Sequence, residues 1–268
     1  MKLWYQSMTR PTAWTAYNEA LRAVLDATKD DGTQIEIHGI EKRGGVGDQY
    51  RYLEFIETQE VLENVERATR EGFDAFLIGN ITEPGLREAR EITDMPVLGL
   101  GETSMHLANM MGGNFSLVTG NQKHVPKIVE NIVRYGLREK LLTVRRMKVD
   151  RLVDLNTGFV DPAAGQALID EFMLAAAANV EEGAELVIPA AGVLMVLLAR
   201  QKIFEVTPGI PILNGVTALV KMGEAAVKMR ALFGGSWTSR RAMYAAPPLD
   251  QIKELRSYYG PVYPWLKT

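Results

Sequence analysis

The sequence contains no cysteine, which excludes disulfide bonds, zinc–thiolate sites and cysteine nucleophiles. It also lacks a long uninterrupted apolar run, and its first residues have neither the basic segment nor the cleavage site of a secretory leader. No run of Lys or Arg is longer than a pair, and the formal net charge is −3. We therefore expect a cytoplasmic protein that binds a small molecule and neither nucleic acid nor a membrane.

Strand-like segments alternate with helix-like ones along the chain. With 47% hydrophobic residues, the 268-residue chain can bury a large core. The first half has five strand-like segments, at 2–6, 34–40, 73–79, 96–101 and 115–120. Helical spacing of apolar residues follows them, at 17–25, 55–70, 103–111 and 125–135. This alternation predicts an α/β fold with a parallel doubly wound sheet.

The second half repeats the pattern. GFDAFLIGN, which begins at Gly72, and GAELVIPAA, which begins at Gly183, share a glycine, an acid two residues on and a buried strand. We predict two lobes, residues 1–120 and 121–230, with 231–268 as a C-terminal helix and tail packing on the lobes. Helices near the C-terminus could return to the first lobe. The active site would lie in the cleft between lobes, at the carboxyl ends of the strands.

The segment GFDAFLIGNITEPGLREAREITDMPVLGLGETSMHLA resembles the hydantoin racemase branch of the aspartate/glutamate racemase superfamily. The resemblance continues through FSLVTGNQKHVPKIVENIVRYGL, GAELVIPAAG and PILNGVTALVKMGEA. It implies two flavodoxin-like lobes related by pseudo-twofold symmetry, and catalysis without metal or organic cofactor. Members use two cysteines on opposite faces of the substrate α-carbon. Here the first position is Asn80 and the second is Ala190 or Ala191, so the chemistry must be different.

Three residues are candidates for replacing the thiols. His38 ends the second strand and can act as a general base, although it can equally bind a loop carbonyl. Glu83 lies three residues past Asn80 before Pro84, where it serves as an acid/base or caps a helix. Asn80 cannot remove a proton and is expected to orient the substrate or stabilise an oxyanion.

Residues at other strand ends are candidates for substrate binding. In relatives, a loop after the first strand and the end of the fifth strand hold the substrate carboxylate. The corresponding side chains or backbone groups here, each also compatible with ordinary turn or helix-start roles, are Ser7, Thr9, Gly79, Glu102, Thr119, Gly120, Ala190, Ala191 and Gly192.

Three functions fit this pattern. The first is a cofactor-independent racemase or other isomerase of a small carboxylate, imide or amino-acid-like substrate. The second is a hydrolase or lyase, which needs an acid/base on only one side. The third is a ligand-binding protein without turnover. The aromatic tail SYYGPVYPWLKT is typical of an extended segment that covers an apolar surface or a neighbouring subunit, so a homo-oligomer is expected.

Overall fold

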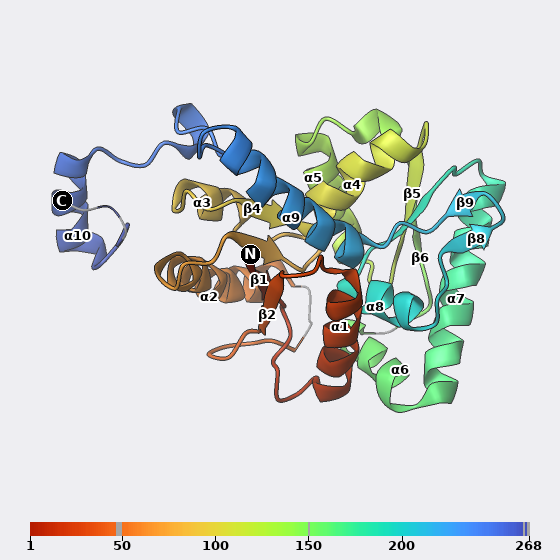
Figure 1. Cartoon of the computed structure of the whole chain (residues 1–268). Helices are drawn as coiled ribbons and strands as arrows, with labels where there is room; N and C mark the ends of the chain where they lie inside the picture. Colours follow the sequence, from red (N-terminus) through yellow and green to blue (C-terminus); the bar gives the residue numbers. More distant parts are fainter. Residues whose placement is uncertain (47–49, 150, 265, 267–268) are drawn as a thin grey trace.

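The computed structural model describes residues 1–46, 50–149, 151–264 and 266, and it contains two parallel sheets (Figure 1). The first sheet has the order β2-β1-β3-β4 and consists of β1 (Lys2–Gln6), β2 (Gln34–His38), β3 (Ala75–Ile78) and β4 (Val97–Gly99). The second has the order β6-β5-β7 and consists of β5 (Phe115–Thr119), β6 (Leu141–Arg146) and β7 (Val187–Pro189). The predicted α/β class with two parallel-sheet lobes is therefore confirmed.

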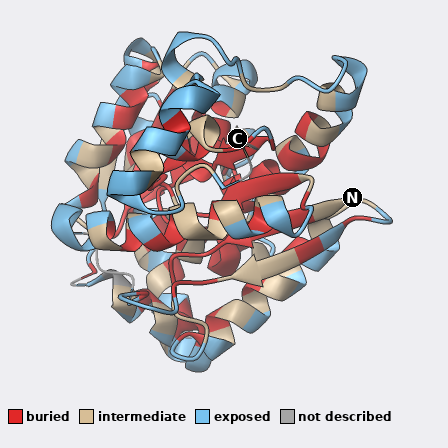
Figure 2. Cartoon of the chain, turned by 90° about the vertical axis from the view of Figure 1, so that its left-hand side faces the viewer, coloured by how far each residue is buried: buried red, intermediate tan, exposed pale blue. Residues whose placement is uncertain are grey.

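Helices cover both faces of the first sheet, because its buried strands are apolar on both sides. Successive side chains of a strand point to opposite faces, so Leu3 packs in the core cluster of α1 (Thr15–Thr28). Trp4 packs in the separate cluster of α2 (Arg51–Arg70). Two further helices, α3 (Leu86–Glu91) and α4 (Leu100–Met111), follow β3 and β4. The buried strands form the centre of the molecule (Figure 2).

The fifth strand differs from the sequence-based expectation. β5 was expected to follow the strands of the first sheet, but it pairs with β6 and β7 and is the central strand of the second. The change of sheet therefore comes before Phe115. β6 was not predicted, because two of the six residues of LLTVRR are charged and the segment can be identified as an edge strand only once its partner is known. The helices of this lobe include α5 (His124–Arg134), α7 (Pro162–Glu181) and α8 (Gly192–Arg200).

The two sheets repeat the same strand order. β1 and β5 are central, with β2 and β6 on one side and β3 and β7 on the other. An isolated parallel bridge between Val187 and Ile212 occupies the place that β4 has in the first sheet. α9 (Gly215–Leu232) follows this bridge as α4 follows β4, and the two helices pack against each other (Figure 1). Both lobes thus meet along α4 and α9, and α9 also contacts β3 and α1 of the first lobe.

Short elements complete the chain. The predicted strand PILNG forms only β9 (Ile210–Pro211), which pairs antiparallel with β8 (Glu205–Thr207), plus the bridge at Ile212. The remaining elements are η1 (Arg138–Lys140), η2 (Leu152–Asn156), α6 (Thr157–Val160), η3 (Ala242–Tyr244) and α10 (Leu249–Tyr259). The start of the tail, expected to be extended, is the end of helix α10. Within the described residues no helix is long and apolar enough to cross a membrane.

Candidate active site

A small cavity of about 50 Å³ lies where the carboxyl ends of the two sheets meet. It is lined by Ser7, Met8, Thr9, Trp14, Tyr17, Gly79, Asn80, Ile81, His124, Leu155, Ala191, Gly192 and Val193. Six of the residues singled out from the sequence are among them: Ser7, Thr9, Gly79, Asn80, Ala191 and Gly192. Strand ends from both lobes therefore converge on one cavity.

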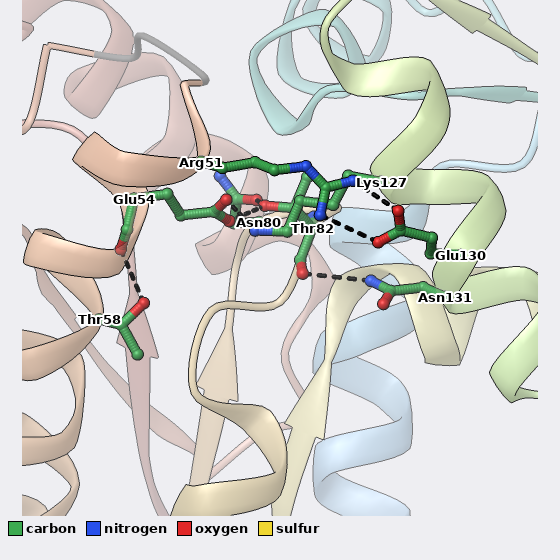
Figure 3. A network of polar contacts seen from close by, with 8 residues as sticks. All are labelled: Arg51, Glu54, Thr58, Asn80, Thr82, Lys127, Glu130 and Asn131. Atoms are coloured by element: carbon green, nitrogen blue, oxygen red, sulfur yellow. Dashed lines mark hydrogen bonds and ion pairs between the residues drawn. The ribbon is translucent and has the colours of Figure 1, made fainter.

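Asn80 is held in one orientation by the turn that follows β3. Its Oδ1 accepts a hydrogen bond from the backbone N–H of Thr82 at 2.8 Å and lies 2.6 Å from the Thr82 hydroxyl (Figure 3). This assigns the amide oxygen to the turn and leaves the amide NH₂ as the free end. Within the described part of the chain Nδ2 has no hydrogen-bond partner. Asn80 can therefore donate to a ligand in the cavity, but it cannot exchange a proton.

Ala191 is the counterpart of Asn80 in the second lobe. The N–H of Gly79 bonds to the carbonyl of Gln6 at 2.8 Å, and the N–H of Ala190 bonds to the carbonyl of Val118 at 2.7 Å. Asn80 follows Gly79 and Ala191 follows Ala190, and both line the cavity. Ala191 is therefore the equivalent of Asn80.

Helix α8 begins directly after Ala191, at Gly192. Its first turn has no side-chain cap, so the N–H groups of Gly192 and Val193 have no partner within the helix and can bind an anion. A Cβ on Gly192 would lie 3.3 Å from the carbonyl oxygen of Gly79. The glycine thus lets the strand-end turns of the two lobes approach each other closely.

Hydroxyl groups follow β1. Ser7 Oγ and Thr9 Oγ1 are 2.8 Å apart, and the Thr9 N–H donates to Ser7 Oγ at 3.2 Å. The backbone N–H of Ser7 donates to the carbonyl of His38 at 2.7 Å, which fixes the turn. Burial raises the pKa of Tyr17 well above its usual range, although a hydrogen bond with Ser7 lowers it. All three hydroxyls are therefore protonated at neutral pH and can donate to a ligand.

His124 is a cavity residue that the sequence-based search missed. It is the first residue of α5 and only 2% exposed, and neither ring nitrogen has a hydrogen-bond partner among the described residues. Burial lowers the pKa of His124 to about 3, so the imidazole is neutral at physiological pH. A buried imidazole without partners, facing a cavity, can accept a proton from a bound molecule or bind its polar groups. Its signal in the sequence was its place five residues after the end of β5.

His38, expected at the site, does not line this cavity. Its ring stacks on Trp4, with 3.5 Å between ring centroids, and Nε2 lies 3.3 Å from a carboxylate oxygen of Glu36. It faces the side of the sheet that α2 covers, because alternation along β2 directs it to the same face as Trp4. Only the backbone carbonyl of His38 approaches the cavity, because it accepts the hydrogen bond from the backbone N–H of Ser7. The ring therefore has a local structural environment, in which it contacts Trp4 and the carboxylate of Glu36 and not the loop carbonyl considered as the alternative.

Glu83 and Glu102 also lie outside the cavity. Glu83 accepts hydrogen bonds from the Tyr135 hydroxyl and, at 2.6 Å, from the backbone N–H of Glu102 in the first turn of α4. It therefore caps α4 and not the helix that follows it in sequence. Burial raises the pKa of Glu83 to about 8, although both hydrogen bonds lower it. Glu102 pairs with Arg90, and one of the two contacts is 3.1 Å.

Three further predicted residues are buried and do not line the cavity. Thr119 accepts a backbone hydrogen bond from Met147 at 2.9 Å, and its neighbour Gly120 is buried beside it. Ala190 is completely buried and hydrogen bonded to β5. Of the two positions considered for the second thiol, the cavity is lined by Ala191 alone.

Among the residues that the structure describes, the cavity is lined by polar groups but by no ionic side chain: none of these lining residues is Arg, Lys, Asp or Glu. Its donors are hydroxyls, the Asn80 amide and backbone N–H groups, and its walls include Met8, Trp14 and Leu155. The N–H groups at the start of α8 can accommodate one negatively charged oxygen, but a cationic or zwitterionic ligand would lose its hydration here without gaining a carboxylate partner among these residues. The site therefore fits a neutral polar molecule.

Comparisons with known proteins agree with this architecture. The family model described as Asp/Glu/Hydantoin racemase matches residues 10–223. A hydantoin racemase from Pseudomonas sp. (strain NS671) is 30% identical over 251 residues, covering 93% of this chain and 92% of that protein. One from Rhizobium meliloti is 32% identical, covering 70% of this chain and 72% of the relative. The solved allantoin racemase from Klebsiella pneumoniae is 25% identical with a TM-score of 0.76, and 92% of this chain and 94% of that chain align.

Proposed function

The chain belongs to the Asp/Glu/hydantoin racemase family, and we propose that it is a cofactor-independent racemase of a neutral cyclic imide of the hydantoin type. The observation that carries the proposal is the uncharged cavity with a partner-free histidine in its wall. An amino acid would leave its ammonium group without a carboxylate partner there, and a dicarboxylate would bring two negative charges to one helix start. The names of the hydantoin and allantoin racemases among its relatives support the same substrate class.

In this proposal His124 removes the proton from the ring carbon next to the carbonyl. The C–H electron pair moves toward the carbonyl oxygen as the proton forms an N–H bond on the imidazole. The amide of Asn80 and the N–H groups of Gly192 and Val193 are the donors for the developing oxyanion. Enolate charge beside the imidazolium raises the pKa of His124 from the low value that burial gives it, which makes the transfer feasible.

The opposite face of the substrate meets Ala191, which cannot exchange a proton. The proposed reaction therefore uses one base: His124 returns the proton after the planar intermediate has turned over in the cavity. Hydroxyls of Ser7, Thr9 and Tyr17 bind the second carbonyl and the ring N–H groups. This differs from the two-thiol chemistry implied by the family resemblance, and the absence of cysteine requires such a difference.

The alanine at position 191 also favours a second candidate. A lyase or hydrolase needs an acid/base on only one face of its substrate and could use the same oxyanion donors. Such an enzyme would convert the substrate into a chemically different product.

Optical rotation distinguishes these functions. One enantiomer of 5-methylhydantoin is incubated with the protein after exhaustive chelation with EDTA, with L-alanine and L-glutamate as charged comparison substrates. The proposal predicts that rotation of the hydantoin decays to zero, that its mass is unchanged and that the amino acids are unaffected. New products would support the lyase or hydrolase. Thermal stabilisation without any turnover would indicate a ligand-binding protein. Racemisation of the amino acids alone would contradict the proposal.

A further inference from the structure

A larger groove of about 670 Å³ is lined in part by the residues that follow two of the cavity residues in the sequence. Asn80 and Ile81 line the cavity, whereas residues 82–88 line the groove. Its other walls are α2 of the first lobe and α5 of the second. Figure 3 shows polar contacts that join these walls, including Lys127 with Glu54 and Asn131 with the carbonyl of Thr82. The groove is therefore distinct from the cavity and has a hydrogen-bonded floor.

Positive charge predominates around this groove, although the whole chain has a net charge of −3. Its cationic side chains are Arg43, Arg51, Arg87, Lys127 and Arg134, and its acidic side chains are Glu54, Glu83 and Glu88. Glu83 contributes little negative charge at neutral pH, because burial raises its pKa to about 8. The groove thus has an excess of positive charge that a neutral ligand would not use.

Three of the arginines are available to a ligand. Arg51 forms an ion pair with Glu130 at 2.6 Å, and Lys127 is paired with Glu54. Arg43, Arg87 and Arg134, in contrast, have no hydrogen-bond or ion-pair partner in the part of the chain that the structure describes. A guanidinium presents a planar set of donors that matches both oxygens of a carboxylate.

The groove also offers apolar surface. Phe55 is 76% exposed, and Ile56, Leu62, Pro84 and Leu86 line the same walls. An exposed aromatic side chain in a concave surface is typical of a site that buries apolar groups on binding. A simple inorganic anion would leave this surface uncovered.

We propose that the groove is a second binding site, for a small molecule with one carboxylate on an apolar or aromatic body. Its carboxylate pairs with Arg87 and Arg134, and its apolar body covers the exposed Phe55 and the half-buried Ile56. The site lies outside the racemase cavity, so the proposal does not depend on the proposed function.

Calorimetric titration with benzoate at low ionic strength tests this site. The variants are R87Q/R134Q, which removes two groove charges, and R200Q/R241Q, which removes two exposed arginines elsewhere and changes the net charge equally. Benzamide, of almost the same shape, is the neutral ligand. We expect saturable benzoate binding to the wild type and to R200Q/R241Q, binding weakened about tenfold or more in R87Q/R134Q, and no binding of benzamide.

Each other result would overturn the proposal. Equal benzoate affinity in R87Q/R134Q would mean that benzoate binds elsewhere, and equal benzamide affinity would mean that the carboxylate is not recognised. No saturable binding to the wild type would mean that there is no such site. Static light scattering supplies a further check. A changed molecular mass in R87Q/R134Q alone would show that the groove is an interface between copies of the chain.

Discussion

At the scale of single residues, His124 is the group on which the proposed chemistry depends. Replacing it by Gln keeps a polar side chain of similar size but removes the proton acceptor. We expect kcat for racemisation of 5-methylhydantoin to fall roughly 100- to 10,000-fold. The other two histidines are the controls: H38Q and H106Q should stay within about twofold of the wild type, because neither side chain lines the cavity. A larger loss in H38Q than in H124Q would restore the original assignment of His38.

The burial of His124 also predicts a pH dependence of stability. Its pKa is about 3 in the folded protein and 6.5 for an unperturbed histidine, so between these values the unfolded chain binds more protons. Stability from the neutral histidine is complete above pH 6.5 and is lost as pH falls toward 3. From pH 7.5 to 5, the free energy of unfolding of the wild type should fall by about 2 kcal/mol more than that of H124Q. Urea unfolding of both proteins at both pH values measures this difference. An equal change in the free energy of unfolding of wild type and H124Q would mean that His124 is not buried.

Asn80 should behave differently from His124. Asn80→Ala removes a hydrogen-bond donor and no titrating group, so kcat should fall about 10- to 1,000-fold with the pH profile unmoved. The matched control is Asn64→Ala, which removes an amide hydrogen bonded to Gln6 outside the cavity. A shifted pH profile in the Asn80 variant would show that it acts on a titrating group and not on the oxyanion.

Some residues of the cavity could be identified from the sequence, and others could not. Asn80 and Ala191 were found because the family resemblance places the two thiols at these positions, and Ser7 because relatives hold the substrate carboxylate in the loop after the first strand. His124 was missed because a loop of four residues separates it from β5, and the path of a loop is not encoded in periodicity. His38 was expected at the site because its position at the end of a strand was considered alone. Alternation of side chains along β2 directs it instead to the face of the sheet that α2 covers.

At the scale of elements, α5 connects the two halves of the site. His124, Lys127, Asn131 and Tyr135 recur at helical spacing on one face of α5 and its end. His124 faces the cavity, Lys127 pairs with Glu54, Asn131 donates to the carbonyl of Thr82 at 3.2 Å, and Tyr135 donates to Glu83. Because Thr82 also holds Asn80, one helix face positions both the proposed base and the proposed oxyanion donor.

Because α5 positions both groups, substitutions of Lys127 and Lys123, two lysines near its start, should differ in their effects on stability and turnover. Lys127→Gln leaves the buried carboxylate of Glu54 without its ion pair, and should lower the free energy of unfolding by about 1–3 kcal/mol. It should also lower kcat, because α5 loses a contact with the first lobe. Lys123→Gln is the control, since Lys123 is exposed and forms no ion pair within the described residues. Equal effects of the two substitutions on stability and turnover would argue against positioning by α5.

Elements were predicted well where local pattern decides them. Runs such as FLIG and PVLG indicate buried strands, and α1, α2, α4 and α5 begin and end within a few residues of expectation. β6 was not identified in these terms, and two of its six residues are charged. A C-terminal helix was expected within 231–268, but the aromatic tail from Ser257 was expected to be extended, whereas α10 continues to Tyr259 and ends at Gly260, which has a φ of 77°.

At the scale of the whole molecule, the two sheets repeat one strand order and meet at α4 and α9. The internal sequence echoes predicted this repeat, but they did not predict which sheet receives β5. That choice depends on pairing with β6 and β7, which lie far along the chain, and local sequence carries little information about such partners. The consequence is functional, because β5 leads into α5 and brings His124 from the second lobe to the cavity.

In the proposed reaction, a histidine of the cavity transfers the proton that the family resemblance assigns to thiols in relatives. Proton NMR of one enantiomer of 5-methylhydantoin in deuterium oxide tests it most directly, by following the hydrogen on the ring carbon in wild type, H124Q and H38Q. We predict exchange by the wild type and H38Q and only background exchange by H124Q. Because one buried base returns the proton, the first inverted product should still carry part of the original hydrogen. Exchange by H124Q at the wild-type rate, or inversion with no retained hydrogen at any time, would contradict the account.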